Sequence, residues 1–302
     1  MQKPPKILLT FAAAAALAVV TAVPAVAQPA PTLEKAKSSG TLAVAYREAS
    51  IPFSYLDGNA QPVGFGWDVC AAIVEEVKKA VGRPDLKVTT QAVTSANRIP
   101  LLQNGTIDIE CGSTTNNAER QQQVAFATNY FYTGTRFLVR SGSPVKAIED
   151  LKGKSVVSTA GTTNIRVIRV LNEQKKLDMN LLSARDHAES ALLVQTGRAD
   201  AFAMDDILLY GIRANAANPA ELAVAGEAIQ VEPYAIMLRK GDPAFKQLVD
   251  GTIARLIKSG DFEKLYAKWF MSPIPPKGIN LNAPMSTELR NNLKALSDRP
   301  AS

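Results

Sequence analysis

Histidine and cysteine are scarce in this sequence of 302 residues, which holds one histidine, His187, and two cysteines, Cys70 and Cys111. Zinc and iron–sulfur sites require several such side chains close together. The two cysteines are far apart in the sequence and neither is next to the histidine. The sequence therefore predicts no metal site and no cofactor.

Sequence motifs of catalysis are missing as well. The chain has no G-x-S-x-G nucleophile turn, no G-x-x-x-x-G-K-[ST] phosphate loop and no cysteine beside a histidine. Asp205 and Asp206 are adjacent carboxylates, but neighbours on a strand point to opposite faces of a sheet. These absences favour binding over catalysis, and we expect that the protein is not an enzyme.

Clustered charge is also absent. Without Lys3 and Lys6 of the N-terminal segment, the chain has 32 basic and 28 acidic residues, and the basic ones are scattered. Proteins that bind nucleic acids usually carry a basic patch or stripe. A solvated surface of mixed charge is the simpler interpretation, so we expect no nucleic-acid partner.

The N-terminal segment has the pattern of an export signal. Lys3 and Lys6 precede an apolar run over 7–23, and Ala25 and Ala27 are small residues before a cleavage site after residue 27. The alternative is an uncleaved membrane anchor, because the run approaches the roughly 20 residues that span a bilayer. Its alanine content and the Ala-x-Ala ending favour a cleaved signal peptide over 1–27 and a periplasmic protein. In that compartment Cys70 and Cys111 can form one disulfide, although two buried free thiols are the other possibility.

The remaining chain alternates between strand and helix patterns, which is typical of a parallel α/β sheet. Strand patterns cover 41–47, 87–93 and 106–111, and a helix pattern begins at Trp67 and ends before Gly82. The alternation restarts after a β-rich segment over 130–144, and a second extended segment covers 230–243. We therefore expect two α/β lobes with two crossings: lobe 1 over 28–137, lobe 2 over 138–232, a return to lobe 1 over 233–271, and a C-terminal arm over 272–302.

Polar and charged side chains follow the predicted strands in both lobes. Ligands of open α/β sheets bind beyond the carboxyl ends of the strands. Ten residues lie at such positions: Arg47, Ser95, Arg98, Ser113, Thr115, Arg120, Thr162, Thr163, His187 and Asp205.

The types of these residues indicate the ligand. Arginine binds carboxylate or phosphate through two parallel hydrogen bonds, and the Gly-Thr-Thr turn ending at Thr163 presents amides at a helix N-terminus, where anions bind. Asp205 is the one acid in the set. Three arginines and one carboxylate match a ligand with more than one anionic group and one cationic group, as in an acidic amino acid.

Each of these residues also has a purely structural interpretation. An arginine after a strand is often a surface or ion-pair residue, and a lone histidine is often a satisfied core residue. Ser95, Thr162 and Thr163 occupy positions where a hydroxyl caps a helix. Asp205 or Asp206 could cap the next helix in the same way.

The segments "RIPLLQNGTIDIECGSTTNNAERQQQVAF", "SARDH", "MDD" and "KWFMSPIPPK" together resemble the periplasmic amino-acid-binding proteins of ABC importers, in particular the subgroup that binds glutamate and aspartate. The resemblance covers essentially the whole chain after residue 27. It implies the two-lobed periplasmic-binding-protein fold of type II, with two hinge strands and the ligand in the cleft between the lobes. One departure is Gly66 in "GFGWDVC", where an acid is usual.

The resemblance also implies roles for the ten residues. Arg120 and the amides of Thr162 and Thr163 would hold the α-carboxylate of the ligand. Ser113, Thr115 and Asp205 would bind its main-chain groups, with Asp205 on the α-ammonium. The site of the side-chain carboxylate matches the remaining residues: Arg47, Ser95, Arg98 and His187.

We therefore expect a monomer that captures glutamate or aspartate by closure of the lobes and then docks on a membrane permease of an ABC importer. Two other functions remain open. One is an enzyme on the same scaffold, similar to the periplasmic cyclohexadienyl dehydratases. The other is a sensor that passes its ligand signal to a receptor.

Overall fold

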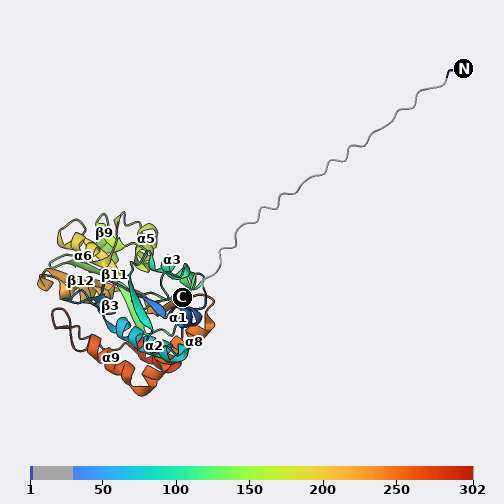
Figure 1. Ribbon diagram of the computed structural model, residues 1–302. Coiled ribbons are helices and arrows are strands. Elements are labelled where there is room, and N and C mark those ends of the chain that lie inside the picture. The colour runs from blue at the N-terminus through green and yellow to red at the C-terminus, as the bar shows by residue number, and fades with distance from the viewer. Residues whose placement is uncertain (3–29, 302) are drawn as a thin grey trace.

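The computed structural model describes residues 1–2 and 30–301, and Figure 1 shows their arrangement. The predicted signal peptide therefore lies almost wholly outside the described residues. Within them, no helix combines the length and the apolar character that crossing a membrane requires.

The structure has two lobes, each built on a five-stranded sheet. In Figure 1 the first lobe carries α2, α8 and α9, and the second carries β9, α5, α6 and β12. The sheet of the first lobe has, in spatial order, β5 (Lys87–Ala92), β1 (Thr41–Tyr46), β6 (Ile109–Glu110), β13 (Met237–Arg239) and β7 (Val124–Phe126). Strands β5, β1 and β6 are parallel, whereas β13 is antiparallel to both of its neighbours.

The sheet of the second lobe repeats this plan. Its spatial order is β10 (Asn180–Ala184), β9 (Ser155–Thr159), β11 (Ala201–Asp205), β8 (Phe131–Arg140) and β12 (Leu222–Tyr234). The first three strands are parallel, and β8 and β12 are antiparallel to their neighbours. The alternation in the sequence therefore predicted the α/β class correctly.

The chain crosses between the lobes twice. It leaves the first sheet between β7 and β8 and returns between β12 and β13. The two crossing segments lie side by side, since Phe131 pairs with Tyr234. These are the two hinge strands that we expected. The predicted lobe boundaries at 138 and 233 fall inside β8 and β12, and they stay a prediction.

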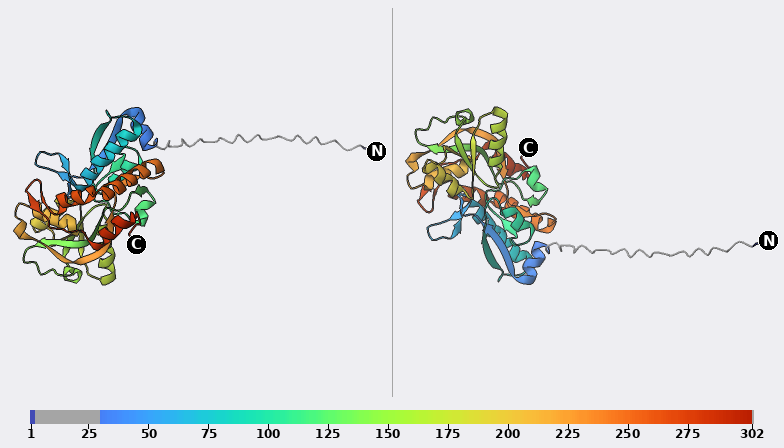
Figure 2. Two further views of the ribbon diagram at one scale, coloured as in Figure 1. Left: turned by 90° about the horizontal axis from the view of Figure 1, so that it is seen from below. Right: turned by 90° about the horizontal axis from the view of Figure 1, so that it is seen from above.

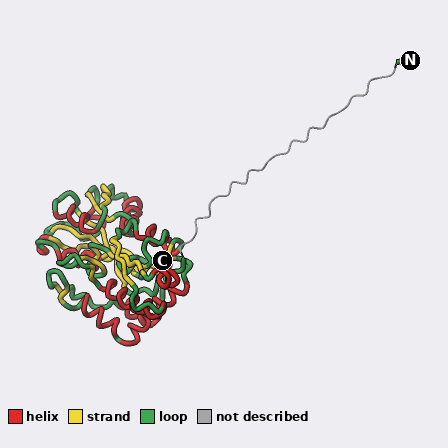
Figure 3. The backbone as a smooth tube through the Cα atoms, viewed as in Figure 1, coloured by secondary structure: helices red, strands yellow, loops and turns green. Residues whose placement is uncertain are grey.

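Amphipathic helices surround both sheets, as Figures 2 and 3 show. The apolar period that begins near Trp67 forms α2, and its buried face includes Val69, Ile73 and Val77. Gly82 ends this helix in the left-handed conformation, which glycine adopts without steric cost. The helices are α1 (Thr32–Ser39), α2 (Phe65–Val81), α3 (Arg98–Gln103), α4 (Ala118–Gln121), α5 (Thr163–Lys175), α6 (His187–Gln195), α7 (Asp206–Asn215), α8 (Pro243–Ser259), α9 (Asp261–Phe270) and α10 (Thr287–Ala295).

Small antiparallel elements and two 3-10 turns complete the fold. The turn-rich segment around Asp57 and Gly58 forms a three-stranded sheet, and a further hairpin lies in the C-terminal arm. These elements are β2 (Ala49–Ser50), β3 (Ser54–Leu56), β4 (Pro62–Val63), β14 (Pro273–Ile274), β15 (Ile279–Asn280), η1 (Ile148–Leu151) and η2 (Pro219–Glu221). The arm packs on the molecule through α10, whose Leu289 and Leu293 belong to the largest apolar cluster.

A cluster of aromatic rings lies at the base of the hinge. Phe53 of the first lobe lies 4.9 Å from Phe131 and 5.1 Å from Tyr234, the paired residues of the two crossings, measured between ring centroids. Phe270 of α9 stacks on Phe131 at 5.0 Å. Such aromatic pairs add about 0.5–1.5 kcal/mol each beyond the area they bury. The cluster thus fixes the crossings to the first lobe.

Candidate functional site

The ten residues that the sequence predicted as a site all follow or end a strand, and the structure brings them together. All are buried, with exposed fractions of 8% or less. Nine of them border a small cavity between the lobes, together with Asn164, Met204 and Leu208. The tenth, Arg47, contacts two of the nine, because its Nη2 lies 2.9 Å from the hydroxyl of Ser95 and 3.3 Å from Nε2 of His187.

The two lobes touch around this cavity. Arg120 of the first lobe donates from Nη2 to the carbonyl of Gly161 in the second, at 3.0 Å. Gly161 has a φ of 77°, and a Cβ atom there would lie 2.5 Å from the Cα of Ala96. Only glycine permits this close approach of the two backbones. The structure therefore shows the lobes in contact across the cavity.

Two buried arginines have free hydrogen-bond donors. Nε and Nη1 of Arg47 and of Arg98 have no partner among the described residues. Burial and the charge of Arg98 lower the pKa of Arg47 to about 9, and burial also lowers the pKa of Arg98. Buried charges are normally paired and hydrogen-bonded. This side of the cavity is therefore suited to an anionic group.

Arg120 and Thr162 bond mainly to the protein itself. Besides Gly161, Arg120 binds the carbonyl of Thr115 through Nη1 at 2.9 Å, and burial together with Arg98 lowers its pKa to about 10. The hydroxyl of Thr162 donates to the carbonyl of Thr159 at 2.7 Å and accepts from the amide of Ile165, so Thr162 caps α5. The amide of Thr163 belongs to the first turn of α5, whose N–H groups lack intrahelical partners. Thr163 and Arg120 both border the cavity, so this end of the helix is suited to an anion.

His187 is neutral and its tautomer follows from its contacts. Its Nε2 faces Nη2 of Arg47, which can only donate, so Nε2 accepts and Nδ1 carries the proton. Nδ1 lies 2.9 Å from the hydroxyl of Thr159. Burial and the charges of Arg47 and Arg98 hold the pKa of His187 well below its usual value. His187 therefore orients the guanidinium of Arg47 without adding a charge.

Asp205 is the acid that borders the cavity. Its Oδ1 accepts from the amide nitrogen of Asn164 at 2.8 Å, and its Oδ2 accepts from the hydroxyl of Tyr234. Burial raises the pKa of Asp205, and the nearby charge of Glu232 raises it further. Ser113, whose hydroxyl has no partner among the described residues, lines the same cavity. A positively charged ligand group beside Asp205 would favour its ionised form.

Sequence reasoning missed three residues of this region. Glu232 and Glu110 are buried carboxylates with exposed fractions of 2% and 0%, and Asn164 borders the cavity from α5. Glu232 lies on β12, whose register shifts between Ile229 and Val231. A rule based on the carboxyl ends of parallel strands does not find a residue within this antiparallel strand. Asn164 was detectable, because it directly follows Thr163 at the start of a helix facing the cleft.

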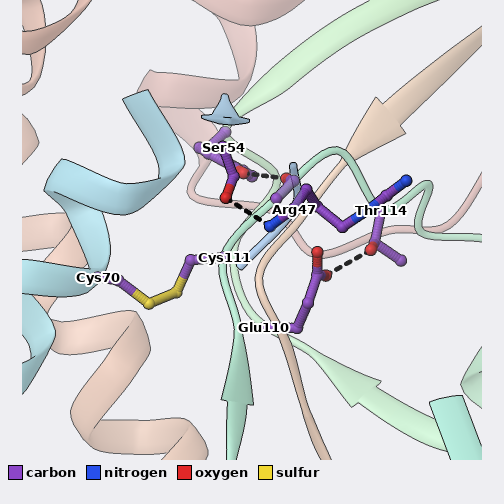
Figure 4. Close-up of a disulfide and its surroundings, with 8 residues drawn as sticks. Arg47, Ser54, Cys70, Glu110, Cys111 and Thr114 are labelled. Carbon is purple, nitrogen blue, oxygen red and sulfur yellow. Dashed lines mark hydrogen bonds between the residues drawn. A yellow bond between two sulfur atoms is a disulfide. The ribbon is translucent and has the colours of Figure 1, made fainter. Parts of the chain in front are cut away.

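A disulfide joins Cys70 of α2 to Cys111, which follows β6, and Figure 4 shows it beside Arg47 and Glu110. The Cα atoms lie 5.9 Å apart, within the usual range. Glu110, the residue before Cys111, accepts a hydrogen bond from Thr114 at 2.5 Å. The bridge therefore ties α2 to the loop that carries Ser113 and Thr115, and the alternative of two free thiols is wrong.

In the part of the chain that the structure describes, no group of three histidine, cysteine, aspartate or glutamate side chains is arranged to hold a metal ion. The polar groups that border the cavity are arginine, histidine, amide, hydroxyl and carboxylate groups, which act by hydrogen bonding and charge pairing. This combination can bind a small zwitterion with an additional anionic group.

Comparison with known proteins gives relatives that cover most of the chain. The L-glutamate/L-aspartate-binding protein of Pseudomonas aeruginosa is 51% identical over 271 residues, which is 89% of this chain and 90% of that protein. The glutamate/aspartate import solute-binding protein of Escherichia coli is 46% identical over 300 residues, 99% of this chain and 98% of that protein.

Solved structures share the fold. A mutant of ArgBP from T. maritima superposes with a TM-score of 0.70 at 28% identity, covering 79% of this chain and 98% of that one. The model of the family described as bacterial extracellular solute-binding proteins, family 3, matches residues 42–272. By this match and by the identity to its relatives, the chain belongs to family 3 of the bacterial extracellular solute-binding proteins.

Proposed function

We propose that this protein binds an acidic L-amino acid, glutamate or aspartate, between its lobes and delivers it to the permease of an ABC importer. One observation carries the proposal. Arg98, which borders the cavity, and Arg47, which lies behind Ser95 and His187, have free donors, and Asp205 borders the same cavity. The printed names of the two relatives, both for glutamate and aspartate, support the same ligand.

The proposed contacts divide the ligand into three groups. Arg47, Arg98, Ser95 and His187 bind the side-chain carboxylate. Arg120 and the amide of Thr163 bind the α-carboxylate, with Thr162 holding the turn as the helix cap. The α-ammonium lies beside Asp205, Ser113 and Thr115, which are acceptors. Each charged group of the ligand then has a partner, as burial requires.

The site acts by closure and without chemistry on the ligand. We propose that an open form receives the amino acid on one lobe and that the other lobe closes over it by motion of the two hinge strands. The contacts of Arg120 with Gly161 and of Arg47 with His187 then form across the cleft. We further propose export through a cleaved signal peptide, a periplasmic location and a monomeric state.

Calorimetry on protein stripped of ligand by unfolding and refolding tests the proposal. Glutamate and aspartate should bind, and glutamine should bind at least tenfold more weakly, because its amide leaves Arg47 and Arg98 without an anion. Binding of glutamine or arginine with no response to either acid would refute it. Incubation with prephenate and arogenate checks the enzymatic alternative, since turnover of either would contradict a pure binding role.

A further inference from the structure

Glu232 connects both lobes behind the cavity. It lies on β12, opposite Thr133 of β8, and its side chain is buried. Its Oε2 accepts from the hydroxyl of Thr115 in the first lobe at 2.9 Å and from the hydroxyl of Thr163 in the second at 2.6 Å. Glu232 does not border the cavity, whereas both threonines do.

The proton count of the two hydroxyls then determines what they offer a ligand. A threonine hydroxyl has one proton and two lone pairs. Thr115 and Thr163 both use that proton on Glu232, so none remains for the contact of 3.5 Å between their own oxygens. The carboxylate therefore makes both hydroxyls acceptors toward the cavity.

The acid near the two threonine hydroxyls is also a hydrogen-bond acceptor. Asp205 is an acceptor beside them, and its hydrogen bonds to Asn164 and Tyr234 fix its orientation. Glu232 adds a second buried carboxylate, whose charge lies close enough to raise the pKa of Asp205. A primary ammonium, with three donors and one positive charge, fits such a set of acceptors.

We infer that Glu232 is a positioning residue for the ligand's α-ammonium, which acts by holding the hydroxyls of Thr115 and Thr163 as acceptors and by adding negative charge behind them. The inference rests on the proposed function. It predicts that Glu232 contributes to binding only when the ligand carries an ammonium, even though the two do not touch.

The test compares glutamate with glutarate, which has the same two carboxylates and no α-ammonium, by calorimetry and by competition at high concentration. Glu232→Gln removes the negative charge. Because both hydroxyls donate to Oε2, an amide oxygen at that place still accepts from both, whereas an amide nitrogen there donates and turns both hydroxyl protons toward the cavity. We expect the Kd for glutamate to rise about 10- to 100-fold, and the Kd for glutarate to change about threefold or less. If glutamate and glutarate lose affinity by the same factor, Glu232 acts only by holding the two lobes together, and the inference is overturned.

Glu110→Gln is the matched control. Glu110 is equally buried and accepts a threonine hydroxyl, from Thr114, but its charge acts on Arg47 and Arg98. This variant should shift both ligands in the same direction and leave their affinity ratio at the wild-type value. A change in that ratio as large as the one caused by Glu232→Gln would contradict the assignment.

A double-mutant cycle with Thr163→Val gives an independent readout that does not depend on glutarate binding. If Glu232 acts through the hydroxyl of Thr163, its replacement costs less affinity for glutamate once that hydroxyl is gone. Strict additivity would overturn the inference. Should Glu232→Gln fail to fold, Thr115→Val and Thr163→Val must each weaken glutamate more than glutarate, or the inference fails. If the wild type does not bind glutamate, the proposed function fails first, which is a different result from parallel losses.

Discussion

Replacing Arg98 should separate ligand binding from stability. Arg98 is 2% exposed, and its Nε and Nη1 have no partner among the described residues. In Arg98→Met the unbranched side chain keeps most of the buried stem but loses the charge and the donors. The proposed carboxylate partner of Arg98 belongs to the ligand, so the loss should appear in binding.

The magnitude follows from the two free donors. A hydrogen bond to a charged group contributes about 1.5–3 kcal/mol, so two lost bonds amount to about 3–6 kcal/mol and weaken glutamate roughly 10²- to 10⁴-fold. The free energy of unfolding of the ligand-free protein should stay unchanged or rise by about 1 kcal/mol, because a buried charge with no partner is unfavourable. When the lobes separate in the ligand-free protein, water hydrates the charge of Arg98, which limits the gain in the free energy of unfolding.

Calorimetry measures the first quantity and urea denaturation of ligand-free protein measures the second. Arg239→Met is the control, since Arg239 is also buried but donates to the carbonyl of Ala30 at 2.9 Å and to the hydroxyl of Thr32 at 3.0 Å, outside the cavity. It should lose about 2–3 kcal/mol of stability and keep its affinity. An unchanged Kd in Arg98→Met, or a loss of ligand-free stability as large as that of the control, would refute the reasoning.

Three further predictions concern the disulfide, pH and the cleft rim. Replacing both cysteines by serine opens a loop with a sequence separation of 41 and should cost about 4 kcal/mol in urea denaturation; a loss below about 1 kcal/mol would contradict this entropic account. The pKa of His187 is lowered in the folded protein, so as the pH falls the unfolded chain takes up a proton on this histidine before the folded protein does. The free energy of unfolding therefore keeps its full contribution from His187 above pH 6.5 and falls by up to about 1.4 kcal/mol per pH unit below it. His187→Gln should flatten that slope in thermal unfolding between pH 5 and 6.5, and an unaltered slope would show that His187 is not its source. Arg166 pairs with Glu119 across the cleft, but their side chains are 44% and 60% exposed, so Arg166→Ala should change the Kd for glutamate about fivefold at most, whereas a 50-fold change would reveal a stronger role.

Much of the fold and site was predictable because both depend on patterns of short range. The helical period from Trp67 to Val81 and the glycine after it predicted α2, and the rule of strand ends brought Arg98 and Asp205 to one cavity, with Arg47 beside it. Glu232 was not predictable, because its inward orientation depends on a register shift in β12 that no local pattern encodes. Thr162 was ambiguous in the sequence, since cap and ligand residues share the same hydroxyl chemistry, and its hydrogen bonds show the cap.

The aromatic cluster at the base of the hinge has a mechanical consequence. Phe53 packs on Phe131 and Tyr234, and Phe270 stacks on Phe131. We therefore expect the part of each crossing segment nearest the first lobe to move together with that lobe. We expect bending between the lobes in the short stretch of β8 after Phe131 and before Thr135, where β8 begins to pair with β11 in the second sheet. We therefore expect the axis of lobe closure to lie nearer to the second lobe than to the aromatic cluster.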